Sequence, residues 1–281
     1  MKADKIKKKL RKKKKKITIK PKDLLSSGST LLNCAVTSDH RGAFAAGHYY
    51  LLVGDSGSGK TWLSMSVLAE AAKSKRFKNH RLIYDNGEDG ALMDIAGYFG
   101  QALADKLEPP ARDSDGDAVY SDTIEELYFH IDDAHKDGRP FIYIQDSVDV
   151  LSSLDDDSKF DSDKAVARGE KSASEGKGSY GVSKAKVSST ILRKVVRRLS
   201  KTGSILILIC QTRDNIGFDA MFNPKVRAGG RSLKFYATIE LWTSVVKKLK
   251  KKVGKRNRKV GIMSRVKTKK NRVDGNEHEI D

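Results

Sequence analysis

Eight consecutive residues, from Gly54 to Thr61, combine glycines, a lysine and a hydroxyl group at a spacing that can do chemistry. They read GDSGSGKT and match the pattern G-x-x-x-x-G-K-[ST] at every fixed position. Glycine lets the backbone turn tightly, so that successive N–H groups can point at one anion. Lys60 would reach the β- and γ-phosphates of a nucleotide, and the Thr61 hydroxyl would hold Mg²⁺. The residues that would contact the nucleotide are Gly54, Asp55, Ser56, Gly57, Ser58, Gly59, Lys60 and Thr61.

The segments on either side of this loop suit a phosphate site. Residues 49–53 predict a buried strand that leads into the loop, and residues 62–72 predict a helix that leaves it. A helix N-terminus adds partial positive charge at the point where phosphates would lie. The alternative is a chance glycine-rich turn between a strand and a helix, but the strand, the helix and the complete pattern favour the phosphate site.

Asp146 stands where a carboxylate could serve the same site. It follows the apolar run 140–144, at the carboxyl end of the predicted strand. This is where an open α/β sheet presents ligand-binding groups. We expect Asp146 to bind Mg²⁺ together with Thr61. The alternative is an aspartate that caps the helix after a strand-to-helix turn.

Two further polar residues follow predicted strands. Glu88 lies just after the strand 81–85 and would polarise an attacking water as general base, with Asp85 and Asp89 as competing candidates. Gln211 ends the strand 204–210 and would sense the γ-phosphate by hydrogen bonding, since an amide cannot act as a base. Alternatively, Gln211 is only a polar residue at the end of a strand.

The elements that must position these residues alternate between strand and helix. Nearly continuous apolar strands that alternate with helices predict a parallel sheet covered on both faces, an α/β fold. Strands are expected at 49–53, 81–85, 140–144 and 204–210, and helices at 62–72, towards Leu103, at 123–136 and at 184–201.

The remaining segments give weaker signals. A short strand is expected at 17–20, a helical segment at 22–35, and loop at 106–121. Residues 155–183, rich in Ser, Gly, Lys and Asp without periodicity, predict a mobile loop. At the C-terminal end, 235–246 and 258–272 predict antiparallel strands joined by a lysine-rich hairpin loop.

Charge is concentrated in two segments. Residues 1–22 hold thirteen Lys and Arg against one Asp, and residues 247–272 hold fourteen and no acid, while the whole chain carries +19. We therefore expect a globular core at 23–281 after a lysine-rich tail at 1–22. Its part 23–246 is near-neutral, and the two basic segments are expected to bind a polyanion. The tail alone is equally consistent with a disordered solubilising segment or, if the host has a nucleus, with a nuclear-import-like signal.

Cysteine content and hydropathy bear on the compartment. Two isolated cysteines fit a reducing compartment better than a disulfide framework. No apolar stretch approaches the ~20 residues of a membrane span, and no apolar region of a secretory signal follows the basic N-terminus. We expect a soluble, intracellular protein without a membrane partner.

With these motifs in place, the sequence from about 24 to 279 resembles the ATPase core of RecA-type recombinases. The segments 26–33 (SSGSTLLN) and 145–151 (QDSVDVL) support the resemblance, besides the phosphate loop. The most specific block is 209–217 (ICQTRDNIG) with 229–237 (GGRSLKFYA), which resembles the second DNA-binding loop of the family. The compact form is similar to phage-encoded recombinases and annealing proteins, and this resemblance implies the cytoplasm of a prokaryotic or phage-infected host cell.

The resemblance implies a RecA-like core and an ATP- and Mg²⁺-dependent, single-stranded-DNA-stimulated ATPase in a helical filament that promotes homologous pairing or annealing. The segments 155–183 and 212–229 would be mobile DNA-binding loops. Lys270 and Arg272 would reach ATP on the neighbouring subunit; the family has lysine at both positions, and Arg272 keeps the charge. The implied DNA-binding residues are Lys186, Arg193, Arg213, Gly229, Gly230 and Arg231, and the implied catalytic ones are Glu88, Lys60, Gln211, Lys270 and Arg272.

Departures from the family, and the shared core itself, leave two other functions open. The family's docking helix at the N-terminus is replaced here by the lysine tail, and the chain ends at Asp281 where a strand would continue, as in a truncated product. These departures leave open a non-hydrolysing recombination mediator. A ring-forming, helicase-like ATPase on the same core is also open, although the block 229–237 favours a filament. The extra basic hairpin 247–259 is either a solvated tip or a DNA contact.

Overall fold

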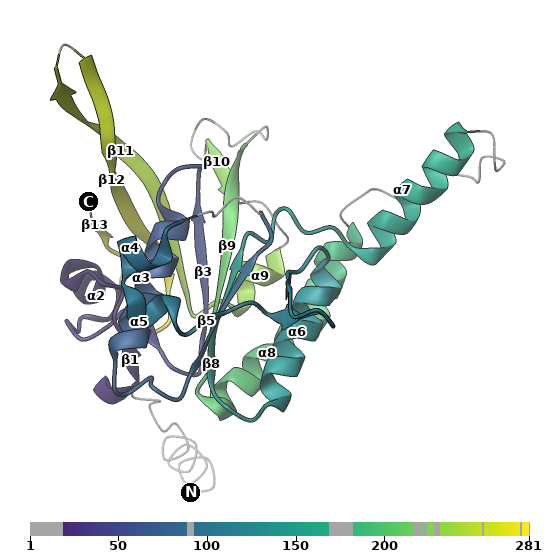
Figure 1. Cartoon of the computed structure of the whole chain (residues 1–281), viewed down its shortest axis with the longest axis horizontal. Helices are drawn as coiled ribbons and strands as arrows, with labels where there is room; N and C mark the ends of the chain where they lie inside the picture. Colours follow the sequence, from purple (N-terminus) through teal and green to yellow (C-terminus); the bar gives the residue numbers. More distant parts are fainter. Residues whose placement is uncertain are drawn as a thin grey trace, which may run out of the picture.

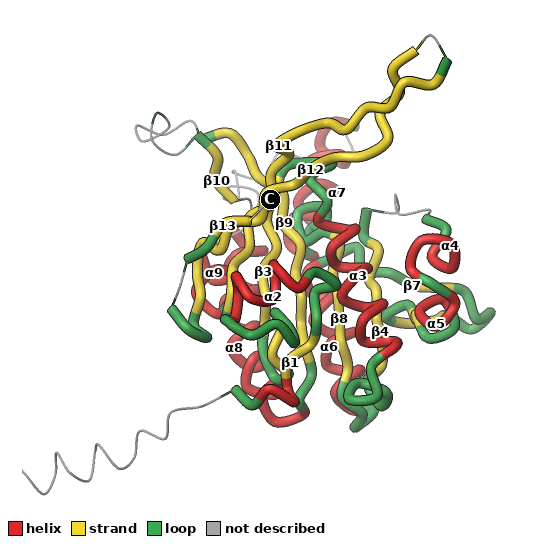
Figure 2. The backbone as a smooth tube through the Cα atoms, turned by 90° about the vertical axis from the view of Figure 1, so that its left-hand side faces the viewer, coloured by secondary structure: helices red, strands yellow, loops and turns green. Residues whose placement is uncertain are grey.

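The computed structural model describes residues 19–88, 93–168, 182–215, 221, 224–227, 231–254, 256–275 and 277–280. A large sheet runs through the middle with helices on both of its faces (Figure 1, Figure 2). Its strand order is β13-β12-β11-β3-β9-β8-β4-β5, with β10 beside β9. The large sheet consists of β3 (Tyr49–Gly54), β4 (Arg81–Asn86), β5 (Leu107–Glu108), β8 (Phe141–Asp146), β9 (Ile205–Asp214), β10 (Lys225–Arg227), β11 (Ile239–Val253), β12 (Arg256–Asn271) and β13 (Glu279–Ile280).

The pairing confirms the predicted fold class. The neighbours from β11 through β3, β9, β8 and β4 to β5 pair in parallel, and β11, β12 and β13 pair antiparallel at the C-terminal end. Outside the large sheet, β1 (Leu24–Leu25) pairs with β2 (Phe44–Ala45) and β6 (Ala111–Arg112) with β7 (Ala118–Val119).

The two faces of the sheet bury separate apolar clusters because side chains alternate along each strand. On one face, Tyr50 and Leu52 of β3 pack with residues of the helices before and after it. On the other, Tyr49, Leu51 and Val53 pack with the later helices. The first face is covered by α2 (Thr30–Thr37), α3 (Lys60–Lys73), α4 (Ile95–Phe99) and α5 (Gln101–Ala104), and the second by α6 (Ile124–Lys136), α8 (Val182–Thr202) and α9 (Arg231–Tyr236).

The segment 155–183 is not a loop throughout, as the sequence had suggested: residues 154–167 form helix α7 (Leu154–Ala167), which projects from the core (Figure 1). Ser153 caps this helix by accepting a hydrogen bond from the Asp156 backbone N–H at 3.2 Å. Three aspartates in the first turn, Asp155 to Asp157, favour the positive end of the helix dipole. Residues 169–181 lie outside the described part.

The basic hairpin also differs from its prediction. The expected loop 247–259 continues as paired strand almost to its tip, since Lys250 lies opposite Lys259 and Val253 opposite Arg256. The result is a long two-stranded ribbon that extends beyond the core (Figure 1). Like charges opposite each other weaken strand pairing, and this explains why the sequence resembled a loop.

Three smaller predictions at the N-terminal side and middle are corrected. Residues 22–35 form a 3-10 turn (Pro21–Asp23), β1 and only then helix α2, because Gly28 has φ +87° and Ser29 caps the helix. Residues 19–20 are not in a strand, and 17–18 lie outside the described residues. The expected loop 106–121 contains three short strands. No helix in the described ranges is both long and apolar enough to cross a membrane.

Candidate functional site

The loop between β3 and α3 has a backbone shape that glycine makes possible. Gly57 and Gly59 have φ values of +69° and +93°, in the left-handed region that side chains disfavour. Lys60 folds back over the loop, and its Nζ donates to the carbonyl oxygens of Gly54 at 2.9 Å and Asp55 at 2.8 Å. The ammonium group is buried, and burial lowers the pKa of Lys60.

Neighbouring strands press against this loop. A Cβ on Gly54 would collide with Thr243 of β11 and would lie 2.6 Å from Ser58 Oγ. Ser58 Oγ is 2.7 Å from Thr243 Oγ1, and Ser264 Oγ of β12 donates to the Ser58 carbonyl at 2.8 Å. Strands β11 and β12 therefore hold the phosphate loop in place through their contacts with Ser58.

Asp146 and Thr61 meet at the start of α3. The Thr61 hydroxyl donates to Asp146 Oδ2 at 2.6 Å, and the Tyr84 hydroxyl donates to the same oxygen at 3.0 Å. Asp146 is buried, and burial raises the pKa of its carboxyl despite these hydrogen bonds. Asn86 is the direct cross-strand partner of Asp146, and among the described residues its buried Oδ1 has no hydrogen-bond partner. These oxygens are the ligand type that Mg²⁺ prefers.

Glu88, just after β4, and Gln211 of β9 also meet. Gln211 does not end its strand as predicted, because β9 runs on to Asp214. Gln211 Nε2 donates to Glu88 Oε1 at 2.8 Å, and the Ser147 hydroxyl donates to the same oxygen at 2.7 Å. Glu88 is exposed to solvent, as a general base toward water must be. The competitor Asp85 is fully buried and accepts hydrogen bonds from Ser121 and Tyr143, so its geometry is structural. The other competitor, Asp89, lies outside the described residues.

A second contact joins the phosphate loop to the strand that continues past Gln211. The Thr212 hydroxyl donates to Asp55 Oδ1, and Lys225 Nζ of β10 lies 3.4 Å from the same oxygen. The hydrogen bond from Thr212 is the main cause of the lowered pKa of Asp55. The loop is thus linked directly to the β9–β10 hairpin, which lies within the predicted loop segment 212–229.

A cavity of about 780 Å³ opens over these residues. Lys60, Thr61, Glu88, Asp146 and Gln211 line one part of it. The segment before α2 lines another part through Ser27, Gly28 and Ser29, and continues into Leu32, while residues of β12 close a further side.

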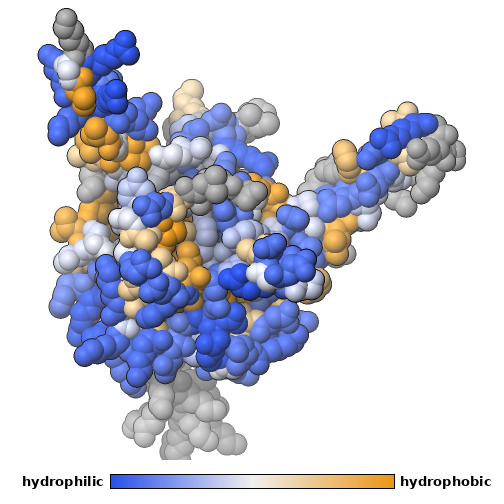
Figure 3. Space-filling model, viewed as in Figure 1, coloured by the Kyte–Doolittle hydropathy of each residue, from blue (hydrophilic) through white to orange (hydrophobic). Residues whose placement is uncertain are grey.

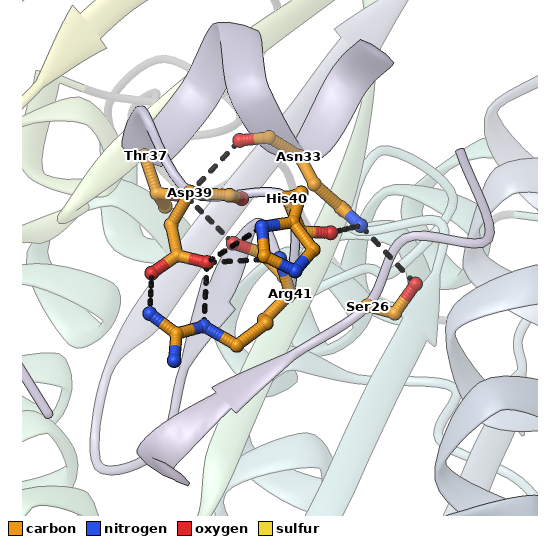
Figure 4. Close-up of polar contacts among 7 residues, drawn as sticks. Ser26, Asn33, Thr37, Asp39, His40 and Arg41 are labelled. Atoms are coloured by element: carbon orange, nitrogen blue, oxygen red, sulfur yellow. Dashed lines mark hydrogen bonds and ion pairs between the residues drawn. The ribbon is translucent and has the colours of Figure 1, made fainter. Parts of the chain in front are cut away.

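The segment before α2 is held by the buried side chain of Asn33 (Figure 4). Asn33 Oδ1 accepts from the Ser27 backbone N–H at 2.9 Å, and its Nδ2 donates to the His40 carbonyl at 3.0 Å. Beside it, Arg41 pairs with Asp39 at 2.6 Å. The wall of the cavity near Ser27 is therefore braced from within the fold.

Lys270 and Arg272 are not brought to this cavity within one subunit. Lys270 is near the opposite end of the sheet, since it pairs with Glu240, which lies beside Leu51 of β3. Lys270 Nζ and Arg272 Nη2 both donate to the Phe235 carbonyl at the end of α9, at 3.0 and 2.8 Å. Desolvation, helped by the nearby Arg272 charge, lowers the pKa of Lys270 to about 8.

The predicted DNA-binding residues are only partly described. Arg193 is exposed on α8 and donates to the Tyr236 hydroxyl at 3.1 Å, and Arg213 is exposed on β9. Lys186 lies in α8 and Arg231 begins α9. Gly229 and Gly230 lie outside the described residues.

Sequence reasoning missed the residues that hold the candidate site in place. Ser147 orients Glu88, Tyr84 binds Asp146, and Thr243 and Ser264 brace the loop. Tyr84 has a signal that could have identified it, because alternation along β4 puts it on the same face as Asn86. Thr243 and Ser264 come from distant parts of the chain, and only the strand order reveals them.

The comparisons with known proteins agree with one another. The family model described as the RecA N-terminal domain matches residues 159–280. Protein RecA of Caldanaerobacter subterraneus subsp. tengcongensis is 30% identical over 252 residues, 89% of this chain and 63% of that relative. Protein RecA of Enterococcus mundtii is 30% identical over 251 residues (89% and 61%), and that of Anaplasma marginale is 30% identical over 253 residues (89% and 60%). The chain thus spans about three fifths of the length of the curated relatives it matches.

Proposed function

The chain has a RecA-type core, and from that premise we propose that it is a single-stranded-DNA-dependent ATPase that promotes homologous pairing or annealing in recombination and repair. The observation that carries the proposal is the convergence of Lys60, Thr61, Asp146, Glu88 and Gln211 on one cavity. A phosphate cradle, a pair of hard oxygen ligands and a solvent-facing carboxylate are the parts that nucleotide hydrolysis needs.

Each residue has a separate part in the proposed chemistry. On nucleotide binding, Lys60 exchanges the Gly54 and Asp55 carbonyls for phosphate oxygens, which offsets the cost of its burial. Thr61 and Asp146 would hold Mg²⁺, and Asn86 offers a buried acceptor beside them. The ion supplies positive charge that neutralises the phosphates. Glu88, kept in position by Ser147, accepts a proton from the attacking water.

Coupling to DNA is proposed to run through Gln211. Its amide contacts Glu88, and the next residue, Thr212, contacts Asp55 of the phosphate loop. Gln211 and Thr212 both belong to β9, which pairs with β10 at the two ends of the segment 212–229. A γ-phosphate that draws Gln211 away from Glu88 would therefore order that segment, and hydrolysis would release it.

DNA contacts are proposed for exposed basic residues without base-specific readout. Arg193 and Arg213 expose guanidinium groups, and Lys186, Arg231 and the glycine pair Gly229–Gly230 complete the proposed set. Helix α7 is unsuited to bind phosphates directly, because it holds five aspartates and two lysines. Single-stranded DNA would then be held mainly through its phosphates.

The proposed assembly puts ATP between subunits. Within one subunit, Lys270 and Arg272 are directed to the end of α9 and away from the cavity that Lys60 lines. They can serve an ATP site only across an interface, on the nucleotide of a neighbouring copy. Such a head-to-tail contact need not close and generates a filament.

Steady-state hydrolysis of ATP by the wild-type protein and by Lys60→Ala tests the site. Loss of the buried ammonium should lower the rate about 100-fold or more, the range measured for a single donor that stabilises developing charge. Hydrolysis that persists in Lys60→Ala would show that the site is wrongly assigned. Nucleotide binding without turnover in the wild type would favour the mediator, and images with only six-fold rings would favour the helicase-like ATPase.

A further inference from the structure

The cavity has two chemically different ends. Every charged or carboxamide side chain that lines it among the described residues lies at the phosphate end: Lys60, Glu88, Asp146 and Gln211. The other end is apolar with small hydroxyl groups. Its described lining includes Leu32, Trp62, Ser66, Val266 and Ile280.

These apolar residues lie together although they are distant in sequence. Val266 of β12 is the direct partner of Ile280 of β13, and both pack against the same core cluster as Leu32. A Cβ on Gly28 would lie 3.5 Å from the Cβ of Ser66, so the segment before α2 and helix α3 are in contact there. Trp62 is one helical turn before Ser66 and shares its side of α3.

Trp62 is the one aromatic residue among the described lining residues of this cavity. Its side chain is 48% exposed, although the indole is held from the outside by Phe99 at 4.9 Å and Tyr98 at 5.2 Å between ring centroids. Both contacts are tilted or edge-on, at 51° and 65°, and they leave indole surface uncovered. An exposed aromatic surface immediately after Thr61 is placed to cover the base of a nucleotide whose phosphates Lys60 and Thr61 hold.

At this end of the cavity, a nucleotide base can be recognised by the area of its ring, but hardly by the hydrogen-bonding groups on its edge. Stacking strengthens with the size of the ring and tolerates different bases. The small hydroxyl groups here already bond within the chain: Ser27 donates to Asn33 Oδ1, Ser29 accepts from the Leu32 N–H, and Ser66 donates to the Trp62 carbonyl. They therefore do not distinguish the amino group of adenine from the carbonyl group of guanine.

We infer that Trp62 stacks on the nucleotide base and that the site accepts purine nucleoside triphosphates as a class, with ATP and GTP used alike and CTP and UTP used poorly. The inference rests on the proposed function, because it concerns the same cavity, and it adds the residue that determines base preference.

Binding and hydrolysis of ATP, GTP, CTP and UTP, measured with the wild-type protein, test the inference. ATP and GTP should have kcat/KM values within about threefold of each other and about tenfold above CTP and UTP, as expected for the loss of one stacking contact. Trp62→Ala should raise KM for ATP and GTP about tenfold, leave kcat nearly unchanged and abolish the purine preference. Trp62→Phe should retain most of that preference.

Trp242→Phe is the matched control, because Trp242 does not line the cavity and its indole N–H donates to Glu240. In this background Trp62 is the remaining tryptophan, and its fluorescence should be quenched by ATP and GTP more than by CTP. A wild type that uses ATP alone, or a Trp62→Ala variant with an unchanged nucleotide profile and normal thermal unfolding, would overturn the inference while the proposed function stands. Failure of all four nucleotides to bind would overturn both.

Discussion

At the scale of single residues, the candidate site holds two buried ionisable side chains, one a cation and one a carboxyl group. Lys60 is buried against two carbonyl oxygens, and Asp146 is buried beside two hydroxyl groups. Sequence spacing was sufficient to predict Lys60, Thr61 and Asp146, since the loop pattern and the strand end fix where their side chains point. It could not predict Ser147 or Asn86, because small polar residues near strand ends have many uses and no distinctive spacing.

Glu88→Gln tests the role of the solvent-facing carboxylate. The amide can still accept hydrogen bonds from Ser147 and Gln211, so nucleotide affinity should change little. Hydrolysis should fall by about 100-fold or more, because the amide cannot take the proton. Equilibrium binding and single-turnover hydrolysis, measured together, separate the two effects; unchanged single-turnover rates would exclude Glu88 as the base.

The lowered pKa of Lys270 predicts a pH dependence of assembly. Lysine is charged below its pKa, so with a value of about 8 its attraction to a neighbour's phosphates weakens as pH rises from 7 to 9. Nucleotide-dependent assembly should therefore weaken over this range by light scattering. The Lys270→Arg variant should still assemble at the higher pH values, because the guanidinium group stays charged. Identical pH profiles for the two proteins would mean that Lys270 does not bridge subunits.

At the scale of elements, the sequence predicted what apolar patterning determines. The central strands β3, β4, β8 and β9 are nearly continuous apolar runs and were predicted close to their observed bounds. Helix α7 was missed because it has no buried residue among those described, so it has no apolar periodicity, although Ser153 and three aspartates marked its start. The ribbon was missed because its strands are runs of basic residues with only scattered apolar ones, outside the core (Figure 3).

The ribbon is predicted to contribute to DNA binding through charge. Lys250 and Lys251 lie opposite Lys259 and Arg258, a repulsion that a polyanion would relieve. We change Lys250, Lys251 and Lys252 to glutamine and measure the association constant for single-stranded DNA against salt concentration. The negative slope of its logarithm against log salt should become shallower by about 2. Lys73, Lys75 and Lys78, exposed at the end of α3 and after it, give a control with the same loss of charge. Equal slopes for both triple variants would exclude a specific contact by the ribbon.

At the scale of the whole molecule, the proposed ATP site is divided between two copies of the chain. Lys60 and Glu88 line the cavity, whereas Lys270 and Arg272 donate to the Phe235 carbonyl at the end of α9. The sequence could suggest this division only through its resemblance to a family. Spacing alone does not tell whether two distant cations meet the same ligand. The phage-like origin and the choice between pairing and annealing stay predictions.

The most direct test of the central claim is steady-state ATP hydrolysis with and without single-stranded DNA, at low and then at moderate salt. The proposed coupling through Gln211 predicts strong stimulation by DNA, which weakens as salt rises because phosphate contacts are screened. Gln211→Ala should bind DNA but lose the stimulation. An ATPase rate that is the same with and without DNA at low salt would contradict the account.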